Sequence, residues 1–460
     1  MSQRVESLPY YADTGPLFAQ VANWRWAIFL DSGPPAARQG RYDIIAADPT
    51  ITLVTRGATT EIESASGVTT SSDDPFALLR RALGRRLPAI GGLPFCGGAL
   101  GYFGYDLGRR VERLPDEALD DRGLPEMAVG IYDWALVVDH RRRRSHLVSA
   151  GRDAATAERW GRLLRLFSAP RRPPPAAPFL TRGEVETTLP PAAYRDGFER
   201  IQRYIRDGDC YQVNYAQRFS VACEGDPWSL YRALRHANPA PFSAWLNLPF
   251  VQILSASPER FLALRAGRVT TQPIKGTARR SDDPVADEAA AAALSASVKD
   301  RAENVMIVDL LRNDLSKSAA PFSVRVPKLF EVQSFATVHH LVSTVTATLR
   351  PGRDALDLLR GCFPGGSITG APKIRAMEII DELERVRRGP YCGCIGYIGF
   401  DGDMDTNIVI RSFTVQQGQM DFWAGGGIVI DSDCAAEYRE TLDKARALRV
   451  LIDRFHAGGR

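Results

Sequence analysis

The sequence lacks long apolar runs and lacks an excess of either charge. No apolar stretch reaches the ~18 residues of a transmembrane helix, and the opening residues, Met1-Ser-Gln-Arg-Val-Glu6, lack the apolar segment of a secretory signal. The 58 basic and 54 acidic side chains leave a formal net charge of +4 over 460 residues, so bulk charge gives no reason to expect binding to nucleic acid. We therefore expect a cytoplasmic protein that binds neither nucleic acid nor membrane.

Cysteine is also scarce. Seven cysteines, an odd number spread over a long chain, do not form the dense framework of a secreted disulfide-rich protein. Reduced and mostly buried thiols are expected. With 45% hydrophobic and 24% charged residues, the composition is that of an ordinary globular protein, and this length predicts a large core or two subdomains that share one.

Lysine is the rarest charged residue, with six lysines among the 58 basic side chains, all in the second half of the chain. A guanidinium stays protonated, so a position that needs a neutral amine cannot be occupied by arginine. Lys275, in Gln272-Pro-Ile-Lys-Gly-Thr277, is thus a candidate nucleophile. An ordinary surface lysine is the alternative.

The chain divides into three parts. Residues 1–167 contain short apolar and β-branched segments that predict strands, with one or two helices. The Pro-rich residues 168–191 predict a connector without regular structure, and residues 192–455 predict a second subdomain. In that part, helices are expected after Tyr194 and near 284–316, 354–361, 371–386 and 434–456, with strands between them. No long alternating strand and helix series occurs, so an α+β fold is favoured over a doubly wound one.

Two of the predicted helices carry carboxylates three residues apart. Asp300 with Glu303, and Glu437 with Glu440, would each lie on one helix face. Four such carboxylates suit Mg²⁺, which needs neither thiol nor imidazole. The alternative is surface pairing with the nearby arginines, namely Arg301, Arg312 and Arg439.

Two glycine-rich segments could offer backbone N–H groups to an anion. Residues 363–373 precede a predicted helix, and residues 423–431 precede the helix that carries Glu437. Arg411 and Lys444 could add positive charge there. Each segment alone could equally be a tight turn. Asp401, Asp403 and Asp405 predict a hairpin turn, because Gly and Glu are missing at the calcium-loop positions that need them.

Taken together, the motifs resemble one family. Ser257-Pro-Glu-Arg-Phe261, Pro273-Ile-Lys-Gly-Thr277, Asp300 to Asp314, His339-His-Leu-Val-Ser343, Pro364 to Lys373, Ala424-Gly-Gly-Gly-Ile428 and Glu437-Tyr-Arg-Glu-Thr441 occur in the order seen in the chorismate-utilising enzymes. That family includes the anthranilate, isochorismate, salicylate and aminodeoxychorismate synthases. The resemblance is dense over residues 192–452 and extends to Gly40-Arg-Tyr-Asp-Ile-Ile-Ala-Ala-Asp-Pro49.

The resemblance implies a fold and a reaction. The fold would be a sandwich of large antiparallel β-sheets flanked by helices, with two subdomains around a central cleft. Lysine at position 275, where anthranilate synthases typically carry alanine, implies amination of chorismate at C4. The lysine would attack C2 to form an adduct that ammonia displaces. Anthranilate formation is the alternative, and a non-catalytic subunit that binds chorismate or tryptophan is the second.

The resemblance also implies roles for individual residues. Glu259 would be the general acid, and His340 an active-site histidine whose role the sequence does not assign. Glu303 and Glu440 would bind Mg²⁺, supported by Asp300 and Glu437. Substrate would be oriented by a further set, which comprises Thr277, Thr369, Gly370, Tyr397, Arg411, Gly425, Gly426, Gly427 and Lys444.

Two binding partners besides chorismate are implied. No Cys/His/Glu amidotransferase segment is visible, so we expect ammonia from a separate glutamine amidotransferase subunit. The stretch Leu30-Asp31-Ser32 resembles the family's tryptophan pocket. Bound tryptophan is therefore a possibility that the sequence leaves open.

Overall fold

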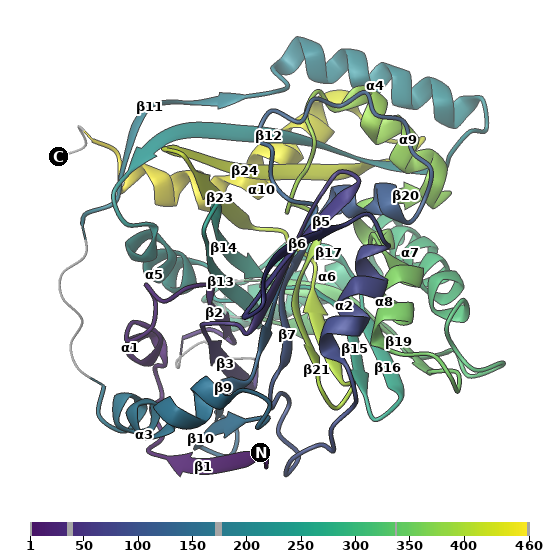
Figure 1. Ribbon diagram of the computed structural model, residues 1–460. Coiled ribbons are helices and arrows are strands. Elements are labelled where there is room, and N and C mark those ends of the chain that lie inside the picture. Colours follow the sequence, from purple (N-terminus) through teal and green to yellow (C-terminus); the bar gives the residue numbers. More distant parts are fainter. Residues whose placement is uncertain (1, 35–39, 171–176, 336–337, 458–460) are drawn as a thin grey trace.

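A computed structural model describes residues 2–34, 40–170, 177–335 and 338–457 (Figure 1). Asp74, Asp226 and Asp283 each accept a backbone N–H at the start of a helix, and each is followed by proline, which is the local chemistry of a helix start. The helices are α1 (Gly15–Phe18), α2 (Pro75–Leu83), α3 (Ala154–Ser168), α4 (Pro191–Arg206), α5 (Pro227–Ala237), α6 (Pro284–Ala296), α7 (Val298–Ser316), α8 (Ala355–Cys362), α9 (Lys373–Leu383) and α10 (Cys434–Asp453), with short 3₁₀ turns at Tyr105–Arg110 and Gly366–Ile368.

The strands form two large antiparallel sheets. In spatial order the first sheet contains β1 (Arg4–Leu8), β10 (Arg144–Ser149), β9 (Trp134–Asp139), β3 (Tyr42–Ala46), β2 (Ala27–Asp31), β13 (Phe242–Leu248), β14 (Val251–Ser257), β23 (Ser412–Gln416), β24 (Gln419–Ile428), β12 (Gln212–Glu224) and β11 (Leu180–Thr187), with β20 (Gly370–Ala371) also on β12. The second contains β17 (Ile274–Arg279), β19 (Val338–Thr348), β16 (Arg268–Gln272), β15 (Arg260–Arg265), β22 (Met404–Asn407), β21 (Cys394–Gly399), β7 (Gly98–Phe103), β8 (Met127–Tyr132), β4 (Ile51–Arg56), β5 (Thr59–Ser64) and β6 (Gly67–Ser71), with β18 (Arg325–Ser334) on β19.

The two sheets pack face to face and helices cover their outer faces. Ile28 and Ile44 of the first sheet meet Leu100 and Ala128 of the second in one buried cluster. Alternate strand residues point to opposite faces, so each sheet also buries an outer face against helices (Figure 1). The α+β sandwich expected from the sequence is confirmed.

Both sheets draw strands from both sides of the predicted connector. The second sheet, for example, pairs β21 with β7, and the first pairs β13 with β2. The division into two subdomains stays a prediction. It divides the sequence into two parts, whereas each sheet contains strands from both parts. The expectation that residues 168–191 lack regular structure is wrong for part of that segment. β11 lies within it and pairs with β12, since residues 180–187 contain no proline and can complete a ladder.

Most predicted helices and turns are confirmed. The helix expected after Tyr194 is α4, which begins slightly earlier, at Pro191, and ends at Arg206. The predicted helix at 284–316 is two helices, α6 and α7, with Ser297 between them. Asp401 and Asp403 lie in the turn between β21 and β22, as predicted. No helix in the described part of the chain is both long and apolar enough to cross a membrane.

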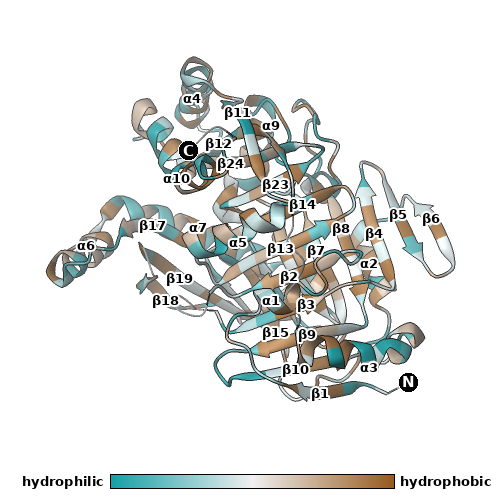
Figure 2. Ribbon diagram, turned by 90° about the vertical axis from the view of Figure 1, so that its left-hand side faces the viewer, coloured by the Kyte–Doolittle hydropathy of each residue, from teal (hydrophilic) through white to brown (hydrophobic). Residues whose placement is uncertain are grey.

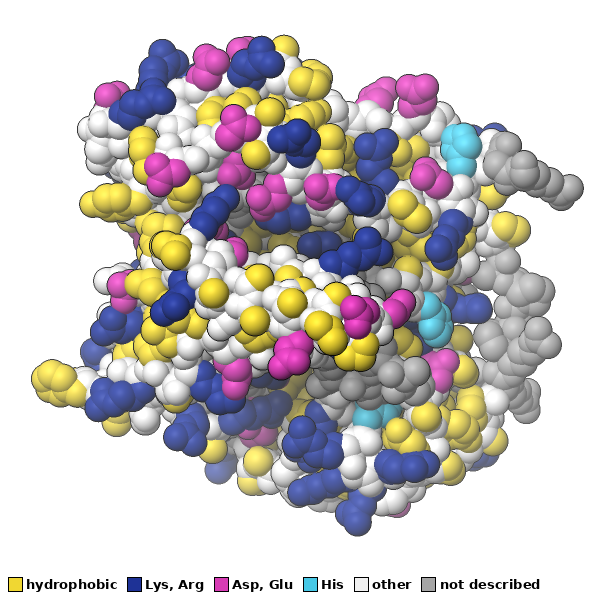
Figure 3. Space-filling model, turned by 180° about the vertical axis from the view of Figure 1, so that it is seen from behind, with side chains coloured by type: hydrophobic (Ala, Val, Ile, Leu, Met, Phe, Trp, Pro, Cys, Tyr) yellow, Lys and Arg dark blue, Asp and Glu magenta, His cyan; other side chains and the backbone are white. Residues whose placement is uncertain are grey.

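Two elements project from the body of the molecule, α6 on one side and the β5–β6 hairpin on the opposite side (Figure 2). α6 consists largely of alanine, and Leu294 is its one buried residue. Seen from behind, basic and acidic side chains gather along a hollow that crosses the middle of the molecule (Figure 3). The chain thus has a charged groove on the side from which α6 projects.

Candidate active site

Lys275 and Glu259 meet at one residue of a glycine-rich loop. Lys275 lies on β17, and Glu259 lies in the turn between β14 and β15, where the chain passes from the first sheet to the second. The Lys275 ammonium donates to the carbonyl oxygen of Ser367 at 3.2 Å. The Ser367 hydroxyl donates to Oε1 of Glu259 at 2.7 Å. The two side chains that the sequence singled out as nucleophile and acid therefore share a neighbour.

Burial determines the protonation states of Glu259 and Lys275. Glu259 is only 6% exposed, and burial raises its pKa to about 7, against the opposing effects of the Ser367 hydrogen bond and the charge of Lys275. Burial also lowers the pKa of Lys275, although Glu303 and Glu259 oppose the shift. Near neutral pH, Glu259 can hold a proton and Lys275 is shifted towards its neutral amine. Those are the states that an acid and a nucleophile need.

Gly276, next to Lys275, lies at a position of the strand where only glycine can be accommodated. The pairing of β17 with β19 shifts register between Lys275 and Thr277, which marks a bulge at Gly276. Its φ is +78°, and a Cβ there would lie 2.9 Å from Cγ of Asp300 and 2.9 Å from Cδ1 of Leu294. Only glycine satisfies both conditions.

The four carboxylates predicted from helix spacing are brought to the same region. α7 packs on β17 and β19, and α10 packs on β24. Burial raises the pKa of Glu303, and the negative charges of Glu440 and Asp300 raise it further. Burial likewise raises the pKa of Glu437, with Glu440 adding to the shift. Carboxylates on two helices that pack on different sheets are therefore close enough to repel one another.

Glycine and lysine accommodate these carboxylates. A Cβ on Gly426 would lie 3.1 Å from Oε2 of Glu437 and 3.6 Å from Oε1 of Glu440, so glycine allows the strand to approach them. Lys444 pairs with Glu440 at 2.7 Å and donates to the carbonyl oxygen of Gly425 at 2.9 Å. Burial acts to raise the pKa of Glu440, but the charge and hydrogen bond of Lys444, together with the charges of Lys299 and Lys275, lower it overall.

The nearby arginines on α7 do not pair with these carboxylates. Arg312 pairs with Asp309 on the exposed side of α7, and Arg301 lies over the ring of Phe330. Across the described ranges, no three His, Cys, Asp or Glu side chains converge as metal ligands do. The carboxylates are grouped, with lysine side chains among them.

The two adjacent histidines face opposite sides of β19, as expected for neighbours in a strand. His340 Nδ1 lies 2.9 Å from the hydroxyl of Thr277, and burial lowers the His340 pKa to about 4. His340 is thus neutral at physiological pH. His339 instead contacts Asp287 of α6 and Ser334, at 3.0 Å and 2.9 Å.

Arg411 lies beside Tyr391 with no carboxylate partner in the described ranges of the chain. Burial lowers the Arg411 pKa, and its φ of +54° holds the backbone in the left-handed region. The ring of Tyr391 stacks on Trp423, with centroids 5.4 Å apart and planes 4° apart. A partly buried guanidinium without a paired anion is suited to an anionic ligand.

The loop at 363–372 differs from the predicted anion site. Lys373 pairs with Asp314 at 2.5 Å and donates to the Cys362 carbonyl at 3.0 Å, so its charge is already used. The Thr369 hydroxyl donates within the loop, to the carbonyl of Gly365 at 3.1 Å. Gly370, with φ of +143°, pairs with β12 so closely that a Cβ would lie 2.1 Å from the Gln212 carbonyl oxygen. The loop also presents Ser367 to Glu259 and Lys275.

A buried ion pair holds this loop from behind. Arg388 pairs with Glu384 at 2.6 Å, and the two side chains are 1% and 2% exposed. Arg388 also donates to the carbonyls of Ile368 at 2.9 Å and Asn214 at 2.7 Å. Glu384 accepts from the backbone N–H of Ala216 at 2.9 Å. Every strong hydrogen-bonding group of the pair is used, which is what a buried charge pair requires.

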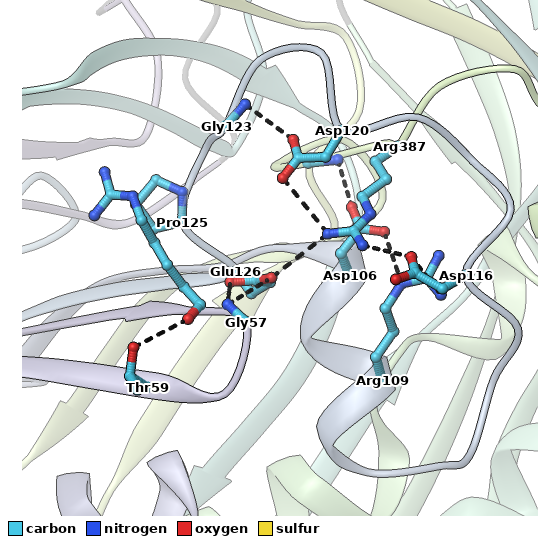
Figure 4. Close-up of polar contacts among 12 residues, drawn as sticks. Gly57, Thr59, Asp106, Arg109, Asp116, Asp120, Gly123, Pro125, Glu126 and Arg387 are labelled. Carbon is cyan, nitrogen blue, oxygen red and sulfur yellow. Dashed lines mark hydrogen bonds and ion pairs between the residues drawn. The ribbon is translucent and has the colours of Figure 1, made fainter. Parts of the chain in front are cut away.

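A second charged network anchors the segment that carries Arg388 (Figure 4). Arg387 pairs with Asp116 at 2.5 Å and lies 3.5 Å and 3.8 Å from Asp120 and Glu126. Asp106 accepts from the backbone N–H of Gly389 at 2.8 Å, and burial raises the Asp106 pKa to about 6. The long segment between the 3₁₀ turn at Tyr105–Arg110 and β8 is thereby fixed to the residues around Arg388.

Two groups of predicted substrate residues are placed differently from expectation. Gly425, Gly426 and Gly427 lie in β24 and pair with β12, so they form a strand and not a loop. Tyr397 accepts a hydrogen bond from Arg265 and faces the space between the sheets, away from the group around Lys275. Ile395 and Tyr397 are two residues apart in β21, so their side chains lie on the same face of the strand.

Sequence reasoning missed Ser367, Arg388 and Tyr391. Ser367 belongs to a segment that was singled out for its glycines, but nothing in the spacing shows that its hydroxyl reaches Glu259. Arg388 is one of many arginines, and only its partners in the fold distinguish it. The aromatic residue beside Arg411 is Tyr391, which precedes β21.

Comparison with known proteins identifies the class. A family model described as chorismate binding enzyme matches residues 35–450. The chain therefore belongs to the chorismate binding enzymes, as the motif resemblance implied. Aminodeoxychorismate synthase component 1 of Salmonella typhimurium is 50% identical over 453 residues, which are 97% of this chain and 98% of the relative.

Two further relatives belong to another branch by name. Anthranilate synthase component 1 of Thermus thermophilus is 40% identical over 437 residues, which are 94% of this chain and 93% of the relative. The crystal structure of anthranilate synthase component I from Streptococcus pneumoniae TIGR4 superimposes with a TM-score of 0.78 at 32% identity, covering 89% of this chain and 92% of that one. The fold is shared between branches, so the branch has to be argued from the site.

Proposed function

We propose that this chain is an aminodeoxychorismate synthase component 1, which converts chorismate and ammonia to 4-amino-4-deoxychorismate and water. The observation that carries the proposal is Lys275, a partly buried lysine of lowered pKa beside Glu259. A nucleophilic amine at this position serves amination and has no use in anthranilate formation, for which the resemblance assigns alanine here. The name of the 50% identical relative supports the same branch.

The proposed chemistry uses the two groups in turn. The neutral amine of Lys275 attacks C2 of chorismate, both conjugated ring double bonds shift, and the C4 hydroxyl departs as water with the proton of Glu259. Ammonia then attacks C4, both double bonds shift back, and the C2–nitrogen bond to Lys275 breaks. The enolpyruvyl group is retained. The proton that ammonia loses returns to the Glu259 carboxylate, so both groups end in their starting states.

Substrate orientation is proposed to depend on the charges around this pair. Arg411 and Lys444 offer positive charge for the two carboxylates of chorismate. Neutral His340, hydrogen-bonded to Thr277, borders the same space. Tyr391, which lies beside Arg411, is proposed to border the substrate as well.

We propose Asp300, Glu303, Glu437 and Glu440 as the residues that hold Mg²⁺. The donors are all carboxylate oxygens, which is the chemistry that this ion prefers. Burial and mutual repulsion raise the pKa of Glu303 and Glu437, and a divalent cation would relieve the repulsion. When bound, the ion supplies positive charge next to a substrate carboxylate.

Two further partners belong to the proposal. The relative's designation as component 1 supports a second component, a glutamine amidotransferase that releases ammonia.

The cavity of about 530 Å³ between the sheets is proposed to hold tryptophan, since Leu30 and Asp31 line it together with Phe242 and Tyr397. Denaturing the purified protein and analysing the supernatant by mass spectrometry tests this, and an extract without tryptophan would exclude a tightly held molecule. All seven cysteines are free thiols, in accord with a reducing cytoplasm.

The deciding experiment is product identification after incubation with chorismate, Mg²⁺ and ammonium. An aminated product that keeps the enolpyruvyl group supports the proposal, and fluorescent anthranilate with released pyruvate would replace it with the anthranilate branch. Lys275→Ala should abolish or redirect amination. Lys328→Ala removes an exposed lysine that pairs with Glu331 on β18 and is the matched control. A Lys275→Ala variant that makes the wild-type product at the wild-type rate would refute the covalent role.

A further inference from the structure

Ser367 uses both of its oxygen atoms on the two proposed reacting groups. Its hydroxyl donates to Glu259 at 2.7 Å, and its carbonyl accepts from Lys275 at 3.2 Å. The residue itself is 8% exposed. Neither contact is needed to close the loop, which has its own hydrogen bond from Thr369 to Gly365.

The backbone on both sides of Ser367 is closely packed. A Cβ on Gly366 would lie 2.3 Å from Cδ2 of Leu310, and one on Gly365 would lie 2.8 Å from Cδ1 of Ile408. On the other side, Arg388 donates to the carbonyl of Ile368 at 2.9 Å. The loop therefore presents Ser367 in one fixed orientation, which is the condition for a residue that aims other groups.

We propose that Ser367 is a positioning residue for the amination, holding the Glu259 carboxyl and the Lys275 amine in place for the same substrate ring. The inference rests on the proposed function. A neutral amine has two N–H bonds and one lone pair. When the Ser367 carbonyl accepts one N–H, rotation about the terminal C–N bond is restricted and the lone pair is held in one direction. The hydroxyl on Oε1 of Glu259 leaves Oε2 to carry the proton.

The hydroxyl has a second consequence for Glu259. A donor to a carboxylate favours the charged form, so Ser367 restrains the rise in pKa that burial causes. The other groups that face Glu259 are Lys275, the backbone N–H of Ile274 and the Cys392 thiol. Removing the Ser367 hydroxyl leaves those in place, so the carboxyl should keep its proton to higher pH.

The test compares Ser367→Ala with Ser367→Thr, which restores a hydroxyl. For Ser367→Ala we expect kcat to fall by about 10- to 100-fold with the KM for chorismate changed less than about threefold, because the loss lies in aiming the acid. The alkaline limb of kcat against pH should move up by about 0.5–1 unit. Ser367→Thr should return kcat to within about threefold of wild type and restore the limb.

The control is Ser318→Ala, because Ser318 is also buried and its hydroxyl also donates a hydrogen bond, in this case to the backbone carbonyl of Asp357. It should leave both kcat and the limb unchanged. If Ser367→Ala does not fold, Ser367→Cys, which has a similar size and a weak donor, takes its place against Ser367→Thr with the same expectations. A variant without the hydroxyl that keeps wild-type kcat and limb would overturn the inference, as would failure of folded Ser367→Thr to restore activity.

Failure of the inference and failure of the proposed function give different results. If the wild-type chain does not aminate chorismate with ammonium and Mg²⁺, the proposed function fails whatever Ser367 does. If the wild type aminates, and Lys275→Ala and Glu259→Gln lose activity while Ser367→Ala does not, the inference alone fails.

Discussion

Lys299 on α7 lies 3.9 Å from Glu437 on α10, from Nζ to Oε1, and so connects the helices on the two sides of the site. The lysine side chain is 62% exposed and the glutamate side chain 4% exposed, which places the pair at the mouth of the site. α7 rests on the second sheet and α10 on the first. The charges of α7 and of α10 therefore act on one another across the site, although the two helices pack on different sheets.

The first prediction concerns magnesium. Glu303→Gln and Glu440→Gln should each raise the Mg²⁺ concentration needed for half-maximal activity by about 10- to 100-fold or more, because each removes a proposed ligand from a small oxygen set. Asp309→Asn, on the exposed side of the same helix, should have no effect. Activity titrations of EDTA-treated protein, together with calorimetry of Mg²⁺ binding, provide the measurement. Equal Mg²⁺ requirements for all three variants would assign the carboxylates another role.

The second prediction concerns pH. Glu259 acts in its protonated form and has a pKa of about 7, so kcat should fall on the alkaline side of the profile. Lys275 acts as the neutral amine, and its pKa is below the usual value, so kcat should also fall towards acid. The profile is measured with the concentration of neutral ammonia held constant at each pH. Glu259→Gln should lower kcat by about 100-fold or more and remove the alkaline limb. A limb that persists unchanged in this variant belongs to another group.

The third prediction concerns stability. Arg388→Ala leaves Glu384 buried without its partner, which should cost about 3–5 kcal/mol of the free energy of unfolding. Arg312→Ala breaks an exposed pair with Asp309 and should cost less than about 1 kcal/mol. Urea titrations followed by tryptophan fluorescence compare the two. Similar losses for both variants would show that the buried pair is no more important than a surface one.

The fourth prediction uses two glycines with nearly equal φ. Gly276→Ala places a Cβ 2.9 Å from Asp300 and Leu294 in addition to the strain of φ +78°, whereas a Cβ on Gly267, at φ +80°, would have nothing within 4 Å. The strain of a positive φ alone should cost Gly267→Ala about 1 kcal/mol of stability, and Gly276→Ala should cost more because of the added crowding. Only Gly276→Ala should also lower kcat, because the crowding displaces the backbone next to Lys275. Equal activity of the two variants would show that the bulge tolerates a side chain.

The sequence alone determined what local geometry and chemistry can determine. Spacing of three residues placed Asp300 with Glu303 and Glu437 with Glu440, because a helix brings such residues to one face whatever surrounds it. The scarcity of lysine drew attention to Lys275, and motif order gave the family. These inferences need only neighbours in the chain, and the roles that they assign to individual residues stay predictions.

The tertiary structure alone decided which face each strand presents and which distant groups meet. Tyr397 faces the space between the sheets because β21 pairs with β7, a contact between residues about 300 apart in the chain. The glycines at 425–427 form a strand because β12 lies beside them. Ser367 contacts Glu259 across 108 positions of sequence. Local pattern carries no information on such pairings, since they are fixed by the packing of one sheet on the other.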